Sequence, residues 1–351
     1  APLGIRICGI VGYIGDEDAI NTIMPGLRRL EYRGYDSAGI SVIQNDSLIS
    51  VKSLGKLTEL EARLGETPMQ GNLGIGHTRW ATHGVPSEAN SHPHLDNLEE
   101  IAVVHNGIIE NYQELGADLR AQGIQFRSET DTETLAHLIR HYYKGDLFAA
   151  VKRALQNVKG AYAVGVVCKD NPDVLIAARH GSPLIVGLGE HSKYIASDAT
   201  AILKYTRDVL YLEDGQVCEL RRDGYTVHNL KGETQALDVH TVDWDHSRAE
   251  KGGYPHFMLK EIHEQPEVLG NTMRGRISES GESILLEDIS LEPDFIRACP
   301  KIFLVACGTA WHAALYGKRL IESMTTIPVE VDIASEFRYR DLLIPEGTIV
   351  I

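Results

Sequence analysis

The chain has 351 residues, more than one hydrophobic core usually supports, so its length predicts about two domains. Aspartate and glutamate number 49 against 34 lysine and arginine, and the net charge of −15 argues against nucleic acid or an anionic membrane as the main partner. No apolar run approaches the roughly 20 residues that span a bilayer, and the first residues lack the pattern of a signal peptide.

The five cysteines, at positions 8, 168, 218, 299 and 307, form no C-x-x-C pair and no disulfide-like spacing. Such a distribution fits a reducing compartment. The sequence therefore predicts a cytoplasmic protein.

The first elements are predicted to run strand, helix, strand between residue 8 and about residue 45. Apolar residues recur at helical spacing in the middle of this stretch, namely Ile20, Ile23, Met24, Leu27 and Leu30. Further strands are predicted at 47–54, 73–77 and 101–105, and helices near 109–122, 132–143 and 147–158. From 162 to 230 strands dominate between turn sequences. This grouping favours an α+β fold of mostly antiparallel sheets covered by helices.

A domain boundary is predicted near residues 240–255, where a charged, glycine-containing stretch begins. Beyond it, strand 301–306 leads through Cys307-Gly308-Thr309 into a helix at 310–324. Strands are expected again at 328–332 and 348–351. The second region therefore reads as the start of an α/β domain built from a βαβ unit.

The segment Cys8-Gly9-Ile10-Val11-Gly12 places a thiol at the start of the first predicted strand. Taken alone, a cysteine in an apolar strand is usually a small buried hydrophobe. Three further segments change that reading: 32–39 (YRGYDSAG), 76–84 (GHTRWATHG) and 105–111 (HNGIIEN). Together, in order and spacing over residues 8–245, they resemble the glutaminase domain of class II glutamine amidotransferases, which have the αββα sandwich of N-terminal-nucleophile hydrolases.

The resemblance implies a catalytic set. Cys8 matches the nucleophile, and the Asn106 side chain and the Gly107 backbone N–H match the oxyanion hole. A thiol at the first position of a chain has its own base, because a free α-amino group has a pKa of roughly 7.7–8.0. Both oxyanion donors suit a tetrahedral intermediate of amide hydrolysis.

The resemblance also implies a glutamine pocket. Free glutamine carries an α-carboxylate and an α-ammonium group, so a selective pocket should offer a guanidinium and a carboxylate a few ångströms apart. Arg79 and Asp131 match the positions with these roles, Trp80 matches the gate of the ammonia channel, and three more matching positions are Arg33, Thr82 and His83.

Five histidines, His77, His83, His92, His94 and His105, lie within thirty residues of one another. His-x-His with no cysteine or carboxylate at ligand spacing is a weak zinc signal. The resembling family uses no metal, and we expect no metal and no cofactor.

The second region resembles the family of glutamine:fructose-6-phosphate amidotransferases, through the junction segment 251–266 and through 306–310 and 333–339. This implies L-glutamine and fructose 6-phosphate as substrates, glucosamine 6-phosphate as product, and a homodimer. Cys307, Gly308 and Thr309 match a sugar-phosphate loop ahead of a helix N-terminus, and Ala310 stands where the family often has serine. The family's phosphate loop and isomerase acid/base residues match nothing here, so we expect residues 246–351 to be the first part of a truncated sugar-isomerase (SIS) domain, and only the glutaminase half to be retained.

Residues 1–7 precede Cys8 and leave it without a free amine. We therefore expect them to be a removed leader or an artefact of the chosen start. Two other functions stay open: a class II amidotransferase of the amidophosphoribosyltransferase type, and a non-catalytic regulator that binds sugar phosphates.

Overall fold

The computed structural model describes residues 8–31, 34, 36–80, 85–242, 254–273, 276–277, 284 and 293–351. The chain divides into two compact units: of the described residues, 8–242 belong to one and those from 254 onward to the other. Each is described by itself.

The first sheet of the 8–242 unit has the strand order β15-β11-β9-β10-β1-β4-β2-β3. Within it β1 pairs antiparallel with β4, in a register that sets Gly9 opposite Thr78. The bounds of its strands are β1 Gly9–Gly15, β2 Ser37–Gln44, β3 Ser47–Leu54, β4 Leu73–Arg79, β9 Ile185–Leu188, β10 Ser192–Ala196, β11 Asp208–Tyr211 and β15 His240–Thr241.

The second sheet has the order β14-β13-β12-β8-β7-β6-β5. Its longest pairing is antiparallel, between β6 and β7, and places Asn106 opposite Ala163 and Gly107 opposite Tyr162. The bounds are β5 His94–Leu95, β6 Ile101–Ile109, β7 Gly160–Cys168, β8 Leu175–His180, β12 Gln216–Arg221, β13 Gly224–Asn229 and β14 Thr234–Gln235. The prediction of antiparallel sheets is thereby confirmed.

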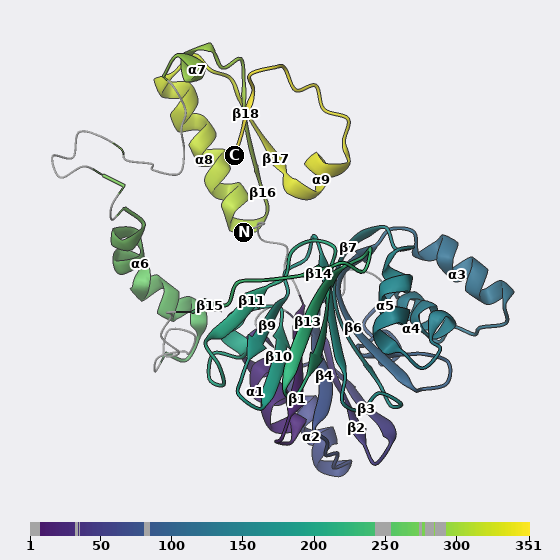
Figure 1. Ribbon diagram of the computed structural model, residues 1–351. Helices are drawn as coiled ribbons and strands as arrows, with labels where there is room; N and C mark the ends of the chain where they lie inside the picture. Colours follow the sequence, from purple (N-terminus) through teal and green to yellow (C-terminus); the bar gives the residue numbers. More distant parts are fainter. Residues whose placement is uncertain are drawn as a thin grey trace. The chain divides into compact units, whose positions relative to one another are not determined.

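Helices cover the outer face of each sheet (Figure 1). Helices α1 (Ala19–Leu30) and α2 (Leu57–Glu66) share a core with the first sheet, and α3 (Tyr112–Ala121), α4 (Asp131–Tyr142) and α5 (Leu147–Leu155) share one with the second. A third core lies between the sheets. The unit is therefore an αββα sandwich, in which α2 was not predicted and the strand before α3 extends to Ile109, where a helix was expected.

Side-chain alternation along the strands decides which residues enter the space between the sheets. On β1, Ile10 and Ile14 belong to the inner core, whereas Val11 and Tyr13 pack with α1. On β6, Ala102 and Val104 belong to the inner core. By the same alternation, the side chains of Cys8, His77 and Asn106 point toward the inner faces of the sheets, and the side chain of His105 points toward α4.

The inner faces approach closely where glycines leave room for Ile195 of β10. A Cβ added at Gly12 of β1, or at Gly165 of β7 in the other sheet, would lie 2.6 Å from an atom of the Ile195 side chain. Ile195 has no exposed surface. One side chain thus fills the space that glycines leave in both sheets.

The unit from residue 254 onward contains a small parallel sheet, in the order β17-β16-β18. The crossover helix α8 links β16 to β17 and packs on them through apolar side chains, as expected for the predicted βαβ unit. The bounds in this unit are α6 Phe257–Met273, α7 Pro293–Ala298, β16 Ile302–Ala306, α8 Gly308–Met324, β17 Val329–Ile333, α9 Ala334–Tyr339 and β18 Ile349–Val350.

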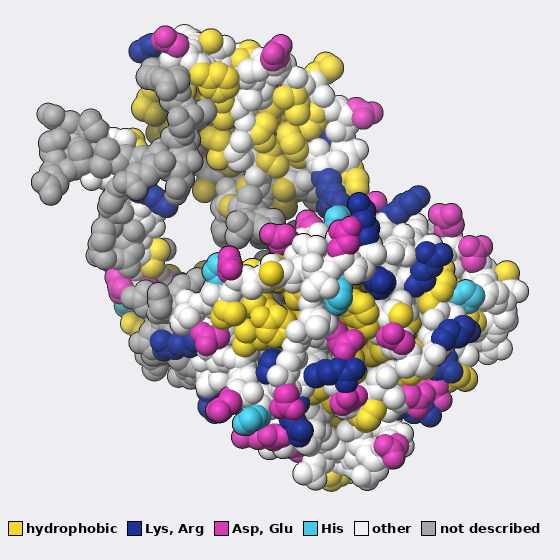
Figure 2. Space-filling view, viewed as in Figure 1, with side chains coloured by type: hydrophobic (Ala, Val, Ile, Leu, Met, Phe, Trp, Pro, Cys, Tyr) yellow, Lys and Arg dark blue, Asp and Glu magenta, His cyan; other side chains and the backbone are white. Residues whose placement is uncertain are grey.

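The visible surface of the 8–242 unit mixes acidic and basic side chains without an extended patch of one sign (Figure 2). Among the described residues, no helix combines the length and apolarity that crossing a membrane requires.

We predict that Ile195→Ala lowers the free energy of unfolding of the 8–242 unit by about 2–5 kcal/mol, because the cavity lies between two glycine-bearing strands that have no side chain to fill it. Hydrogen exchange of the β1 and β10 amides measures this loss. Leu54→Ala is the control, because Leu54 is 45% exposed and its loss should cost far less. Equal protection in the two variants would contradict the packing role of Ile195.

Candidate functional site

Cys8 lies directly before β1 and is partly buried. The backbone N–H of Trp80, the residue after β4, donates to Cys8 Sγ at 3.1 Å, and the thiol lies 3.6 Å from the Trp80 carbonyl oxygen. Next to Cys8, the Gly9 N–H donates to the Thr78 hydroxyl at 3.2 Å. The end of β4 therefore fixes the position of the thiol.

The surroundings of Cys8 favour the neutral thiol. Burial raises the pKa of Cys8 above its ordinary value, and Asp36 adds to the increase, although the Trp80 N–H and Arg79 oppose it. A thiol attacks carbonyl carbons as the thiolate. Nucleophilic chemistry at Cys8 near neutral pH therefore needs a base that removes the proton.

Asn106, on β6 of the second sheet, reaches across to Cys8. Its Nδ2 donates to the Cys8 carbonyl oxygen at 2.7 Å, and its Oδ1 lies 3.0 Å from Nε2 of His77 on β4. The Asn106 side chain is buried. A primary amide has two N–H donors, so one donor remains beside the thiol-bearing residue.

Gly107 follows Asn106 in a conformation that only glycine adopts readily, with φ of 134°. A Cβ at this position would lie 2.0 Å from the Ala161 carbonyl oxygen of the neighbouring strand. The backbone geometry and the tight β6–β7 pairing therefore both require glycine beside Asn106.

Arg79 ends β4 and is buried, with its Nη1 3.9 Å from Oδ1 of Asp36. The loop before β2 lies against this strand end, because a Cβ at Gly34 would lie 2.7 Å from the Arg79 carbonyl carbon. The Asp36 N–H also donates to the Arg79 carbonyl oxygen. A buried guanidinium thus lies one residue from Trp80 and close enough to Cys8 to lower its pKa.

Asp131 is the first residue of α4, and its Oδ2 accepts the backbone N–H of Ile109 at 2.8 Å. This bond joins the start of α4 to the end of β6, two residues beyond Gly107. Asp131 is therefore held to the same strand that carries Asn106 and Gly107.

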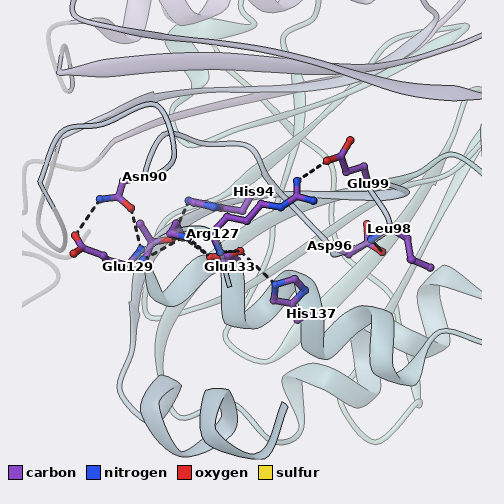
Figure 3. A network of polar contacts seen from close by, with 11 residues as sticks. Asn90, His94, Asp96, Leu98, Glu99, Arg127, Glu129, Glu133 and His137 are labelled. Carbon is purple, nitrogen blue, oxygen red and sulfur yellow. Dashed lines mark hydrogen bonds and ion pairs between the residues drawn. The ribbon is translucent and has the colours of Figure 1, made fainter. Parts of the chain in front are cut away.

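The segment before α4 is fixed by a network of polar contacts (Figure 3). Glu133 accepts the backbone N–H groups of Arg127 and Ser128, each at 2.7 Å, and its carboxylate lies 3.4 Å from His137 Nε2. Asn90 accepts the Glu129 N–H at 3.0 Å, and Thr130 contacts His94 Nε2 at 2.9 Å. These bonds determine where α4 begins, and so where Asp131 lies.

Four of the five clustered histidines lie among the described residues and are buried, namely His77, His92, His94 and His105. The rings of His77 and His92 stack with centroids 4.2 Å apart, and those of His92 and His94 meet edge to face at 4.7 Å. Burial lowers the pKa of each, that of His77 to about 3. Across the described ranges no group of three or more histidine, cysteine or acidic side chains is arranged to hold a metal ion.

Comparisons with known proteins find similarities in both units of the chain. A family model described as a glutamine amidotransferase domain matches residues 77–204, and one described as a SIS domain matches 295–351. The glutamine–fructose-6-phosphate aminotransferases (isomerizing) of Clostridium perfringens and Thermus thermophilus are each 51% identical over 345 residues, 98% of this chain. Over these 345 residues the chain is similar to both aminotransferases.

The chain spans 56% of the length of each of these two relatives. Among solved structures, a glutamine phosphoribosylpyrophosphate amidotransferase from Bacillus subtilis is similar with a TM-score of 0.59 and 23% identity, over 92% of this chain and 65% of that one. At that identity the likeness concerns the fold alone. The fold is that of the N-terminal-nucleophile hydrolases, as predicted.

The glutaminase residues predicted from the family pattern fall into three groups. The structure brings Trp80 and Asn106 each into direct contact with Cys8, and Arg79 and Gly107 are their neighbours in the chain. Asp131 is linked to β6, and its expected pairing with Arg79 around glutamine stays a prediction. Arg33, Thr82 and His83 lie outside the described residues, as do residues 1–7.

The predicted sugar-phosphate residues lie at the carboxyl end of the parallel strand β16. Cys307 precedes α8, and Gly308 and Thr309 form its exposed first turn, with φ of 60° at Gly308. The helix begins two residues earlier than predicted. Backbone N–H groups at a helix start are unpaired within the helix and suit an anion, but the role of these residues stays a prediction.

Sequence reasoning missed the contacts of His77 and Asp36. His77 was weighed only as a metal ligand, although it contacts Asn106. Strand parity in 73–79 and 101–109 was the available signal, since it sends the side chains of His77 and Asn106 into the space between the sheets.

We predict that the start of α4 loses stability in acid through Glu133. Burial alone would raise the pKa of Glu133, but hydrogen bonds from His137, Ser128 and the Arg127 N–H outweigh it and hold the pKa at about 2. A depressed carboxyl pKa stabilises the fold above the ordinary value near 4.5 and ceases to do so as pH falls toward 2. Hydrogen exchange of residues 127–142 between pH 5 and 2 measures the change.

Glu133→Gln should lower protection already at pH 5 and flatten its pH dependence. Glu114→Gln, at an exposed position on α3, should leave both unchanged. An unaltered pH profile in Glu133→Gln would contradict the assignment.

Proposed function

We propose that this protein is a glutamine-dependent amidotransferase that hydrolyses glutamine at Cys8 and passes the ammonia to fructose 6-phosphate, forming glucosamine 6-phosphate. One observation carries the glutaminase half: the Asn106 Nδ2 lies 2.7 Å from the Cys8 carbonyl oxygen, although the two residues are 98 positions apart. A cysteine directly before a strand of one sheet and a buried amide donor on a strand of the other sheet are therefore in direct contact.

In the proposed reaction the Cys8 sulfur attacks the carbon of the glutamine side-chain amide. The thiol proton passes to the α-amino group of Cys8, directly or through water. The carbonyl oxygen becomes an oxyanion, which Asn106 Nδ2 and the Gly107 N–H stabilise. Collapse of this intermediate breaks the C–N bond, the protonated nitrogen leaves as ammonia, and water then hydrolyses the γ-glutamyl thioester to glutamate.

For substrate selection, Arg79 binds the α-carboxylate of glutamine and Asp131 binds its α-ammonium group. A buried guanidinium and a carboxylate held at a helix start suit these charges, and the burial of both side chains supports the assignment. Arg33, Thr82 and His83 complete the pocket, and Trp80 gates the ammonia path.

For the acceptor, the SIS-type unit binds the sugar phosphate near Cys307, Gly308 and Thr309. The name of these relatives supports fructose 6-phosphate as the acceptor. A phosphoribosyl acceptor receives less support, because the chain is 51% identical to the fructose-6-phosphate enzyme of C. perfringens but 23% identical to the phosphoribosylpyrophosphate enzyme. A purely regulatory role does not require the contact between Cys8 and Asn106.

The protein functions as a homodimer in the cytoplasm, without nucleic acid or membrane as a partner. The five free cysteines suit a reducing compartment. The net charge of −15 disfavours nucleic acid.

We predict that Cys8→Ala abolishes glutamate release from glutamine, lowering kcat by at least about 10³-fold, because no other thiol lies beside Asn106 in the described structure. A coupled glutamate dehydrogenase assay, with and without fructose 6-phosphate, measures the rate. Cys168→Ala is the control, since that buried thiol lies on β7. Equal rates in wild type and Cys8→Ala would refute the glutaminase.

We predict that glutamine hydrolysis at pH 7.5 requires cleavage of the peptide bond between Ile7 and Cys8. With a raised thiol pKa, a form that keeps residues 1–7 has no amine base at Cys8 and should be slower by about 10²–10⁴-fold. Its rate should rise with pH above 9, as the thiolate forms without help. Mass spectrometry defines the N-terminus of each form, and full activity at pH 7.5 in protein that retains Ala1 would exclude the amine as base.

A further inference from the structure

The amide of Asn106 has a defined orientation, which its two neighbours set. The Cys8 carbonyl oxygen, 2.7 Å away, is only an acceptor, so the nitrogen end of the amide faces Cys8. The oxygen end therefore faces Nε2 of His77, 3.0 Å away. An amide turned by 180° would exchange donor and acceptor at both positions.

The same contacts define which nitrogen of His77 carries its proton. Nε2 lies 3.0 Å from Asn106 Oδ1 and 3.2 Å from the His105 carbonyl oxygen, and both are acceptors. Nε2 must therefore bear hydrogen. Nδ1 is buried and has no hydrogen-bond partner within the described part of the chain, which fits a ring nitrogen without hydrogen.

His77 is neutral under all conditions in which the enzyme is expected to work. Burial lowers its pKa to about 3, so the ring neither gains a charge nor supplies a proton near pH 7. Its chemistry is that of a fixed, uncharged N–H donor.

The ring of His77 is also held in place. It stacks on His92 at 4.2 Å, and His92 Nδ1 accepts the backbone N–H of His105 at 3.3 Å. His92 in turn meets His94, which contacts Thr130 next to the start of α4. The donor thus belongs to a buried stack that links β4 to β5 and β6.

We propose that His77 is a positioning residue of the glutaminase: its Nε2–H holds the Asn106 carbonyl oxygen away from the reacting carbon and so keeps Nδ2 directed at the developing oxyanion. This inference rests on the glutaminase proposed above. Without the donor, the amide loses one of the two bonds that distinguish its orientations. In the turned orientation an amide oxygen would face the oxyanion and repel it.

The test separates the donor from the ring. His77→Phe keeps an aromatic ring in the stack but removes the N–H, and kcat for glutamate release should fall by about 30-fold or more, toward the 10²–10³-fold that loss of one oxyanion donor costs. KM for glutamine should change less than about threefold, because the bond acts on the transition state. His77→Gln, whose amide nitrogen reaches the position of Nε2, should recover at least about tenfold of the loss.

A double-mutant cycle identifies Asn106 as the residue through which His77 acts. In an Asn106→Ala background, His77→Phe should lower kcat less than about twofold further. If the fold-losses in kcat of the two single variants multiply in the double variant, the proposal is overturned. Full activity in His77→Phe would overturn it too. His92→Phe is the matched control: it removes a buried imidazole that does not contact Asn106, and an equal loss there would assign the effect to packing of the stack.

A second pair of variants decides the matter if His77→Phe does not fold. Asparagine at position 77 places its amide nitrogen near the position of Nδ1, so His77→Asn should stay impaired where His77→Gln is active. Equal activity of the two would overturn the proposal.

The wild type and Cys8→Ala are assayed alongside. Glutamate release that does not depend on Cys8 refutes the glutaminase itself, and the role of His77 with it. Cys8-dependent release that is insensitive to substitution of His77 refutes only the positioning role.

Discussion

The side-chain amide of Asn106 is the interaction on which the site depends, because it joins strands of both sheets. It donates to Cys8 beside β1 and accepts from His77 on β4, while its own backbone belongs to β6. The amide is buried, so leaving either end unpaired would cost roughly 1–3 kcal/mol. Its contacts therefore hold the ends of the two sheets in one arrangement.

The close approach of the sheets makes this bridge possible. Glycines on β1 and β7 leave room for Ile195 between them. Because Gly107 has no Cβ, β6 can lie tightly against β7. An amide side chain is short, so a wider gap would separate Asn106 from Cys8. Packing at the centre of the sandwich and geometry at its end are thus connected.

The start of α4 is fixed by hydrogen bonds to Glu133, Asn90 and His94. Asp131 follows at once and bonds to the Ile109 N–H. The chain therefore holds a carboxylate at one point and a thiol at another through networks that both contact β6 and that the histidine stack connects. Such division suits a pocket that binds one end of a substrate while it reacts at the other.

The sequence alone determined much of this protein, because local pattern decides local structure. Apolar spacing predicted α1, the strand predicted at 47–54 matches β3, and the four motif segments indicated the family and its fold. Helix α2 was missed, since only Leu57 and Leu60 of it are buried, and Ile109 was assigned to a helix although β6 includes it. Only the tertiary structure decided the partners of His77, the orientation of the Asn106 amide and the contact between Cys8 and Trp80. These contacts join segments 29 to 98 residues apart, and such distances along the chain are closed by sheet packing, which no local pattern encodes.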